Sequence, residues 1–195
     1  MLPTCRKQFR IACVAGVLLC SASWAAAQTA SNSPRERFSA VAVNNSTVGR
    51  SGAEQVDITI RRWTTDAERD RLVTMFKEKG PKALLSELQK MKPVGTINTP
   101  GNVAYDLRYA RQLPGEDGGR RIILATDRPI GFWEASAQPR TVDYPFVLIE
   151  MHLNKGGEGE GKLSLATKLT LNDNVLVIEN YANQPVMLND IKQRK

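Results

Sequence analysis

The feature that most constrains this fold is a change in hydrophobic periodicity near residue 94. Beyond that point the chain consists of runs rich in β-branched and aromatic residues, and apolar side chains recur at every second position, as at Leu163, Leu165, Leu169 and Leu171. Alternation of this kind is typical of β-strands with one buried face. Short segments rich in Gly, Pro, Asn and Asp separate the runs. Because a parallel return needs a long crossover, gaps this short predict antiparallel neighbours.

The residues before that point predict two further strands and then two helices. Strands are expected at residues 37–43 and 55–63. Thr65 and Glu68 have the spacing of a capping box, Gly80 suits a helix end, and Pro81 suits the first turn of a second helix. Each helix has one apolar face, formed by Leu72, Met75 and Phe76 in the first and by Leu84, Leu85, Leu88 and Met91 in the second.

Together these patterns predict an α+β fold that is mainly an antiparallel β meander. We expect about eight or nine strands, closed as a barrel or folded as a sandwich, with a two-helix insertion near residues 65–91. The chain shows no internal repeat and no linker long enough to divide it. Residues 38–195 are therefore expected to form a single domain, preceded by a flexible lead-in at residues 28–37.

The first 27 residues predict a secretory signal peptide that is cleaved after Ala27. They have a basic start, an apolar run, and small residues around the expected cleavage site. A membrane anchor is the alternative, but the strongly apolar part ends near Cys20, short of the ~20 residues that a spanning helix needs. A lipoprotein reading of Cys20 is weakened by Leu19, which stands where a small residue is usual. The expected location is the periplasm or the extracellular medium.

Cleavage would change both the charge and the redox chemistry of the protein. All three cysteines lie in the predicted signal peptide, so the mature chain would have no thiol and no disulfide. The signal would also remove three basic residues, which lowers the net charge from +7 to +4, that is 24 minus 20. The remaining charges are interspersed apart from short basic pairs. We therefore expect no nucleic-acid partner, because such proteins cluster Lys and Arg or present aromatics for stacking.

Residues 153–166 contain most of a phosphate-binding loop motif, a Gly followed by four residues and then Gly161 and Lys162. Such a loop must lead into a helix, whose first amides hold the phosphate. Here a strand pattern follows, Leu163 stands where a hydroxyl belongs, and Glu158 and Glu160 would repel an anion. We therefore predict the tip of a β-hairpin and no bound nucleotide. A calcium loop is the other possibility, but two glutamates are few for six or more oxygen ligands.

The residue inventory also limits the possible chemistry. His152 is the only histidine and no cysteine would remain after cleavage, so we expect no zinc site built from these residues. We also expect no other metal site and no cofactor. Glu150 and His152 share a strand face, and we interpret them as a polar pair on the surface rather than a catalytic pair. Carboxylates offer the remaining route to hydrolysis. Interleaved arginines favour ion pairing instead, and the possible polar cluster comprises Asp127, Arg128, Glu134 and Asp143.

Three stretches of the chain resemble an uncharacterised group of exported bacterial proteins. They are GGRRIILATDRPIGFWE, DYPFVLIEMHL and GEGEGKLSLA, and the resemblance covers most of residues 56–181. It implies an exported bacterial setting and transfers no activity, cofactor or catalytic residue.

Two classes of function are the main candidates. The first is a non-catalytic structural or protein-interaction domain of the cell envelope, which would bind on a sheet edge or face. The second is a periplasmic module for a small apolar ligand, with a cavity lined by aromatic residues. The candidate lining residues are Trp63, Tyr105, Tyr109, Phe132, Trp133 and Tyr144. A carboxylate-dependent hydrolase is a third and weaker alternative.

Overall fold

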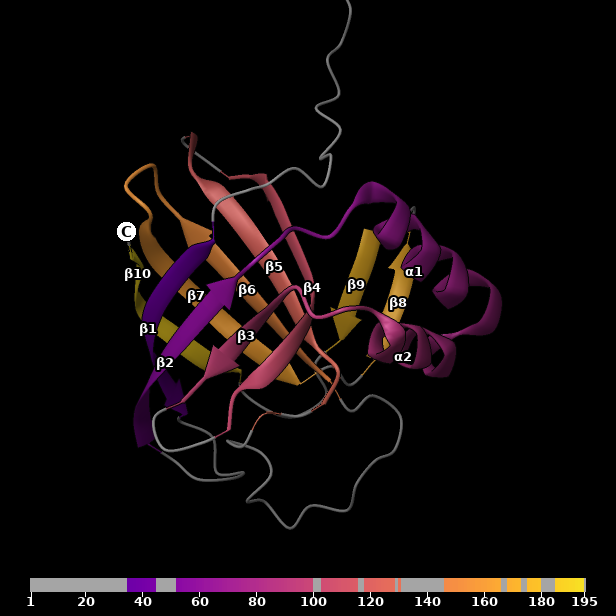
Figure 1. Cartoon of the computed structure of the whole chain (residues 1–195), viewed down its shortest axis with the longest axis horizontal. Coiled ribbons are helices and arrows are strands. Elements are labelled where there is room, and N and C mark those ends of the chain that lie inside the picture. Colours follow the sequence, from indigo (N-terminus) through magenta and orange to yellow (C-terminus); the bar gives the residue numbers. More distant parts are fainter. Residues whose placement is uncertain are drawn as a thin grey trace, which may run out of the picture.

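Eight strands form a closed antiparallel barrel in the computed structural model, in the order β1-β10-β7-β6-β5-β4-β3-β2 (Figure 1). The structure describes residues 35–44, 52–99, 103–115, 118–128, 130, 146–165, 168–172, 175–179 and 185–194. The barrel strands are β1 (Glu36–Asn44), β2 (Gly52–Ile60), β3 (Gly95–Asn98), β4 (Tyr105–Pro114), β5 (Arg120–Thr126), β6 (Val147–Leu153), β7 (Glu158–Leu165) and β10 (Val186–Arg194). The predicted antiparallel meander is confirmed, and it closes as a barrel.

The described residues form ten strands, whereas about eight or nine were expected. One reason is that the alternating run at residues 161–171 is two strands. β7 ends at Leu165, and β8 (Lys168–Asn172) pairs only with β9 (Val175–Glu179) in a separate two-stranded sheet. The pairing explains the break. Leu165 lies opposite Val147, the first residue of β6, so β7 has no partner on that side beyond this point. Apolar residues at every second position indicate a β-strand, but they do not show where the neighbouring strand ends.

The pairing of the first strand with the last closes the barrel. β1 pairs with β2 on one side and with β10 on the other, and Arg37 lies opposite both Thr59 and Arg194. β1 begins at Glu36, within the segment expected to be a flexible lead-in. Residues 1–34, including the predicted signal peptide, lie outside the described residues.

The barrel interior is filled by apolar side chains from every barrel strand. Many of them have no exposed surface at all, among them Val56, Ile97, Leu107, Ile122, Leu124, Val147, Ile149, Met151, Leu163, Leu188 and Ile191. A side chain that lined a water-sized void would keep some exposed surface, so these residues line none. Eight strands give a barrel just wide enough for side chains to fill, as they do here.

Glycines allow β7 to approach its neighbour β6 closely. A β-carbon on Gly159 would collide with the carbonyl oxygen of His152, and one on Gly161 with that of Glu150. The alternating glycines that resembled a nucleotide motif therefore have a packing role. The turn before them spans residues 154–157, and Lys162 lies within β7. The predicted hairpin tip is confirmed.

Two helices lie between β2 and β3 and cover one outer side of the barrel (Figure 1). They are α1 (Asp66–Lys79) and α2 (Pro81–Lys90). Leu72 of α1 and Leu88 of α2 pack with Leu148 and other apolar residues of β5 and β6 in a second core outside the barrel. An ion pair between Arg71 of α1 and Glu87 of α2 joins the helices, and Glu87 also pairs with Lys90 within α2.

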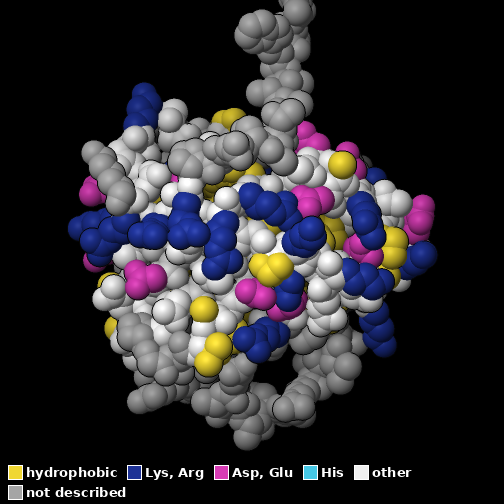
Figure 2. Space-filling model, viewed as in Figure 1, with side chains coloured by type: hydrophobic (Ala, Val, Ile, Leu, Met, Phe, Trp, Pro, Cys, Tyr) yellow, Lys and Arg dark blue, Asp and Glu magenta, His cyan; other side chains and the backbone are white. Residues whose placement is uncertain are grey.

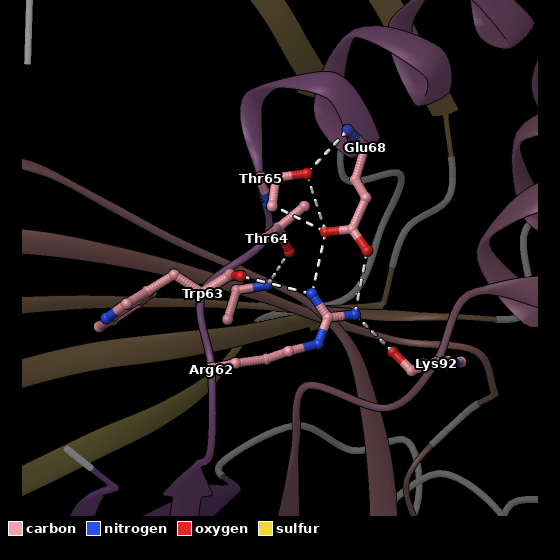
Figure 3. A network of polar contacts seen from close by, with 7 residues as sticks. Arg62, Trp63, Thr64, Thr65, Glu68 and Lys92 are labelled. Atoms are coloured by element: carbon pink, nitrogen blue, oxygen red, sulfur yellow. Dashed lines mark hydrogen bonds and ion pairs between the residues drawn. The ribbon is translucent and has the colours of Figure 1, made fainter. Parts of the chain in front are cut away.

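A network of polar contacts fixes the start of α1 (Figure 3). The Thr65 hydroxyl accepts from the Glu68 amide at 3.1 Å, and the Glu68 carboxylate accepts from the Thr65 amide at 2.9 Å, so the predicted capping box is present. Arg62 donates to both oxygens of Glu68, at 2.9 and 3.0 Å, and to the Lys92 carbonyl at 3.2 Å. The network therefore links the end of β2, the first turn of α1 and the segment after α2.

Thr64 joins the same segment to the barrel wall. β4 has an irregular register between Leu107 and Tyr109, which is typical of a β-bulge. The amide of Ala110 donates to the Thr64 hydroxyl at 2.9 Å, and the Thr64 amide donates to the Ala110 carbonyl at 2.8 Å. Both residues have no exposed surface. The buried hydroxyl thus supplies an acceptor for a β4 amide next to the bulge.

No helix within the described ranges is both long and apolar enough to cross a membrane.

Candidate functional site

The three predicted aromatic residues that the structure describes do not share one core. Tyr105 belongs to the core inside the barrel, and Trp63 packs against that core. Tyr109 packs in the second core, beneath the helices. Tyr105 and Tyr109 are four residues apart, and the bulge between them shifts the alternation, so they lie on opposite faces of the barrel wall. Burial raises the pKa of the Tyr109 hydroxyl. The other predicted lining residues, Phe132, Trp133 and Tyr144, lie outside the described residues.

Two members of the predicted polar cluster are described, and each has its own partner. Asp127 accepts from Arg108 at 2.8 Å, and Arg108 also pairs with Asp106 at 3.3 Å. The guanidinium of Arg128 lies 4.8 Å from the ring centre of Tyr105. This arrangement is the ion pairing that the interleaved arginines indicated. Glu134 and Asp143 lie outside the described residues.

A polar network closes one mouth of the barrel. Arg120 pairs with Glu36 at 2.7 Å and donates to the side-chain oxygens of Gln112 and Gln193 at 3.0 and 2.9 Å. Its guanidinium lies 5.6 Å from the ring centre of Phe38, which belongs to the interior core. The side chains of Arg120 and Glu36 are only 19% and 13% exposed. We call Glu36, Gln112, Arg120 and Gln193 the mouth network.

An open pocket of about 330 Å³ lies at the mouth network. The β4–β5 and β6–β7 turns form the rest of its wall, including Asn154, Lys155 and the backbone of Gly118. The Arg120 charge in this pocket is already neutralised by Glu36, and both terminal nitrogens of Arg120 have partners. The network therefore seals the barrel end rather than offering unpaired groups to a ligand.

On the outer face of β5, β6 and β7, Glu150 is surrounded by basic groups. It pairs with Arg121 at 2.6 Å and Lys162 at 3.0 Å, and its oxygen lies 3.1 Å from His152 Nε2. Burial opposes its ionisation, but the Lys162 hydrogen bond and the Arg121 and Lys162 charges prevail and lower the Glu150 pKa. Glu150 is thus a carboxylate at neutral pH, which suits a structural anchor and not a proton donor.

Five exposed cations form what we call the basic band on the outer face of β10, β1 and β2. They are Arg35, Arg37, Arg61, Lys192 and Arg194. Arg37 lies directly opposite Arg194, Lys192 lies opposite Ser39, and Arg35 and Arg61 continue the β1–β2 register by one step. Figure 2 shows a band of Lys and Arg side chains across this face.

The cations of the basic band lack acidic partners within the part of the chain that the structure describes. No ion pair of these five residues is found there, whereas Arg62, Arg108, Arg111, Arg120 and Arg121 each pair with a carboxylate. Arg194 donates to the buried Ser39 hydroxyl at 2.9 Å, which fixes its position on the sheet. The nearest acids in the register are Asp57, opposite Ser39, and Glu158, opposite Lys192.

The sequence prediction missed both the basic band and the mouth network. A signal for the band was present, because Arg35 and Arg37 are two apart, as are Lys192 and Arg194, so each pair shares a strand face. Their gathering depends on the pairing of β1 with β10, which local patterns do not reveal.

The described side chains also bear on whether the chain could hold a metal ion. Within the described ranges, no group of three or more His, Cys, Asp and Glu residues is placed to hold a metal ion. The basic band gathers five exposed cations that have no acidic partner among the described residues. We take it as the candidate site.

Comparison with known proteins returned no matching family model, no matching curated protein and no matching solved structure.

Proposed function

We propose that this protein is a non-catalytic binding domain of the bacterial cell envelope that holds its partner against the outer surface of the barrel. The packed interior carries this proposal. Many interior side chains from all around the barrel have no exposed surface, so these side chains line no cavity that water could enter. A ligand site inside a barrel needs such a cavity, commonly of ~300 Å³ or more. Binding on the outside needs none.

The distribution of charge supports the same proposal. The described cations elsewhere on the wall of the barrel are held in ion pairs, for example Arg108 with Asp127 and Arg121 with Glu150. The basic band is different, because its cations are exposed and lack such partners among the described residues. Like charges directly opposite each other on paired strands are destabilising, which applies to Arg37 and Arg194. A surface that is costly for folding is a reasonable place for binding.

Two measurements test the proposal. Native mass spectrometry of the protein purified from its bacterial host should show a mass without a co-purifying small apolar molecule. A photo-cross-linking residue should then replace Thr59, which lies opposite Arg37 on the outer face. Irradiation in an envelope extract should give a discrete adduct there. The matched position is Glu160, an exposed residue of β7 outside the basic band, which should give none.

The two results that would contradict the proposal differ from each other. A bound small apolar molecule that resists extensive washing would support the interior ligand module instead. Equal adducts at Thr59 and Glu160 would show that the basic band is not a preferred contact surface. Hydrolase activity has no support in the described geometry, since Asp106 and Asp127 both serve as partners of Arg108.

A further inference from the structure

We infer that the basic band binds a linear anionic polysaccharide that lies across strands β10, β1 and β2. This inference rests on the proposed function and specifies its partner. Its basis is the chemistry and arrangement of the five band residues, together with what surrounds them.

The band has the composition of a site for carboxylate or sulfate groups. Four of its five residues are arginines. The planar guanidinium donates paired hydrogen bonds that match the two oxygens of such groups, and it stays charged at any physiological pH. The Arg194 side chain is already held by the Ser39 hydroxyl, so less of its freedom remains to be lost on binding.

The arrangement suits a linear ligand. Neighbouring strands lie ~4.8 Å apart, so positively charged groups on β10, β1 and β2 follow one another across the sheet at short steps. Arg194 and Arg37 are directly opposite, and Arg61 follows at the end of β2. A polymer with a charge on each sugar unit could neutralise these groups in turn. Such a ligand would also relieve the repulsion between Arg37 and Arg194.

The surroundings favour a narrow polymer over a lipid surface. Asp57 and Glu158 are exposed on the same face and lie opposite Ser39 and Lys192. A flat anionic membrane would bring negative charge to these carboxylates as well, within the ~8–10 Å range of electrostatic interactions in physiological salt. A chain that follows the arginines need not cover Asp57.

The surroundings also disfavour single-stranded nucleic acid. Proteins that bind it combine a basic groove with aromatic side chains on which the bases stack. Apart from one another, the register neighbours of the band residues are Ser39, Thr59 and Glu158, and none of them is aromatic. A polymer without bases needs no such platform.

The test compares two double variants with the same net charge. Arg37→Gln/Arg61→Gln removes two cations of the basic band, and Lys79→Gln/Lys82→Gln removes two exposed cations from the helices. Binding of a heparin oligosaccharide is measured by isothermal calorimetry over a range of salt concentrations. Anionic vesicles of phosphatidylglycerol in phosphatidylcholine and an oligothymidylate provide the lipid and nucleic-acid comparisons.

The wild type and the helix variant should bind heparin with the same affinity, to within about twofold. The band variant should bind roughly tenfold or more weakly, since each cation near an anionic surface contributes substantially to affinity. Its salt dependence should also be shallower, by about 0.7–0.9 per lost contact in the slope of log affinity against log salt. Thermal unfolding should show that the band variant is at least as stable as the wild type, because it loses the Arg37–Arg194 repulsion.

Four outcomes would overturn the inference: no saturable heparin binding, equal weakening in both variants, tighter binding to the vesicles, or tighter binding to the oligothymidylate. A failure here is distinguishable from failure of the proposed function. If heparin does not bind but the cross-linker at Thr59 still gives a discrete adduct, the outer surface remains the binding surface and only the class of partner is wrong.

Discussion

Replacement of Thr64 by valine tests how the helical pair is fastened to the barrel. Valine has nearly the same shape as threonine, so the substitution removes the hydroxyl without opening a cavity. The Ala110 amide, which donates to that hydroxyl at 2.9 Å, would then have lost its acceptor in a place with no exposed surface. An unsatisfied buried group of this kind costs about 1–3 kcal/mol.

The expected loss in the free energy of unfolding is about 2 kcal/mol, or about 4–8 °C in midpoint temperature for a domain of this size. Thr64→Ser is the matched control. It keeps the hydroxyl and loses one methyl group, at a cost of about 0.8 kcal/mol.

Urea unfolding followed by circular dichroism measures both variants, and hydrogen exchange at the Ala110 amide gives a local readout. Thr64→Val should be the less stable of the two and should expose this amide to faster exchange. If Thr64→Val proves as stable as Thr64→Ser, or if exchange at Ala110 is unchanged, the hydroxyl does not have the role that we assign to it.

Three further predictions concern the barrel itself. Arg120→Met should lower the free energy of unfolding by about 2–3 kcal/mol, because it leaves the Glu36 carboxylate largely buried without its cation. Gly161→Ala should cost about 2–4 kcal/mol, since the new methyl group collides with the backbone of β6. Glu150→Gln should be less stable than the wild type at neutral pH, and this difference should shrink as the pH falls below 4.5.

The sign of the pH effect follows from the lowered Glu150 pKa. A carboxyl group with a lower pKa in the folded state stabilises the protein above the ordinary pKa of 4.5, and this contribution is lost as the pH falls through the folded-state pKa. A difference that stays constant down to the acid limit would contradict the argument. Circular dichroism melts at a series of pH values provide the measurement.

Matched substitutions control the other two predictions in denaturant titrations. Arg69→Met breaks an exposed pair with Asp70 and should cost less than about 1 kcal/mol. Gly156→Ala places its methyl group 3.1 Å from a side-chain oxygen at an exposed turn, which is a much milder contact than the backbone collision at Gly161. The reasoning fails for Arg120 or Gly161 if the variant is no less stable than its control.

Features encoded within a few residues could be predicted from the sequence. The capping box of Thr65 and Glu68 and the helix end at Gly80 are visible as short spacings, and the structure contains both. The hairpin at residues 154–157 followed from the strand pattern after Lys162. In each case the residues that decide the structure are neighbours in the chain, so local propensity suffices.

Features that depend on register could not be predicted in the same way. Closure as a barrel needs β1 to pair with β10, and the hydrogen bond between Gln193 and Glu36 joins residues 157 positions apart. The separation of Tyr105 from Tyr109 depends on a bulge that an alternating pattern does not reveal. The basic band arises only when both ends of the described fold are placed side by side.

That late pairing has a consequence during synthesis. Until β10 has left the ribosome, β1 and β7 have no partner on one side, and the nascent chain is a sheet with two open edges. Joining segments so distant in sequence also carries an entropic cost that shorter hairpins avoid. A chain that lacks β10 should therefore remain incompletely folded and prone to association, however much of the earlier meander has already formed.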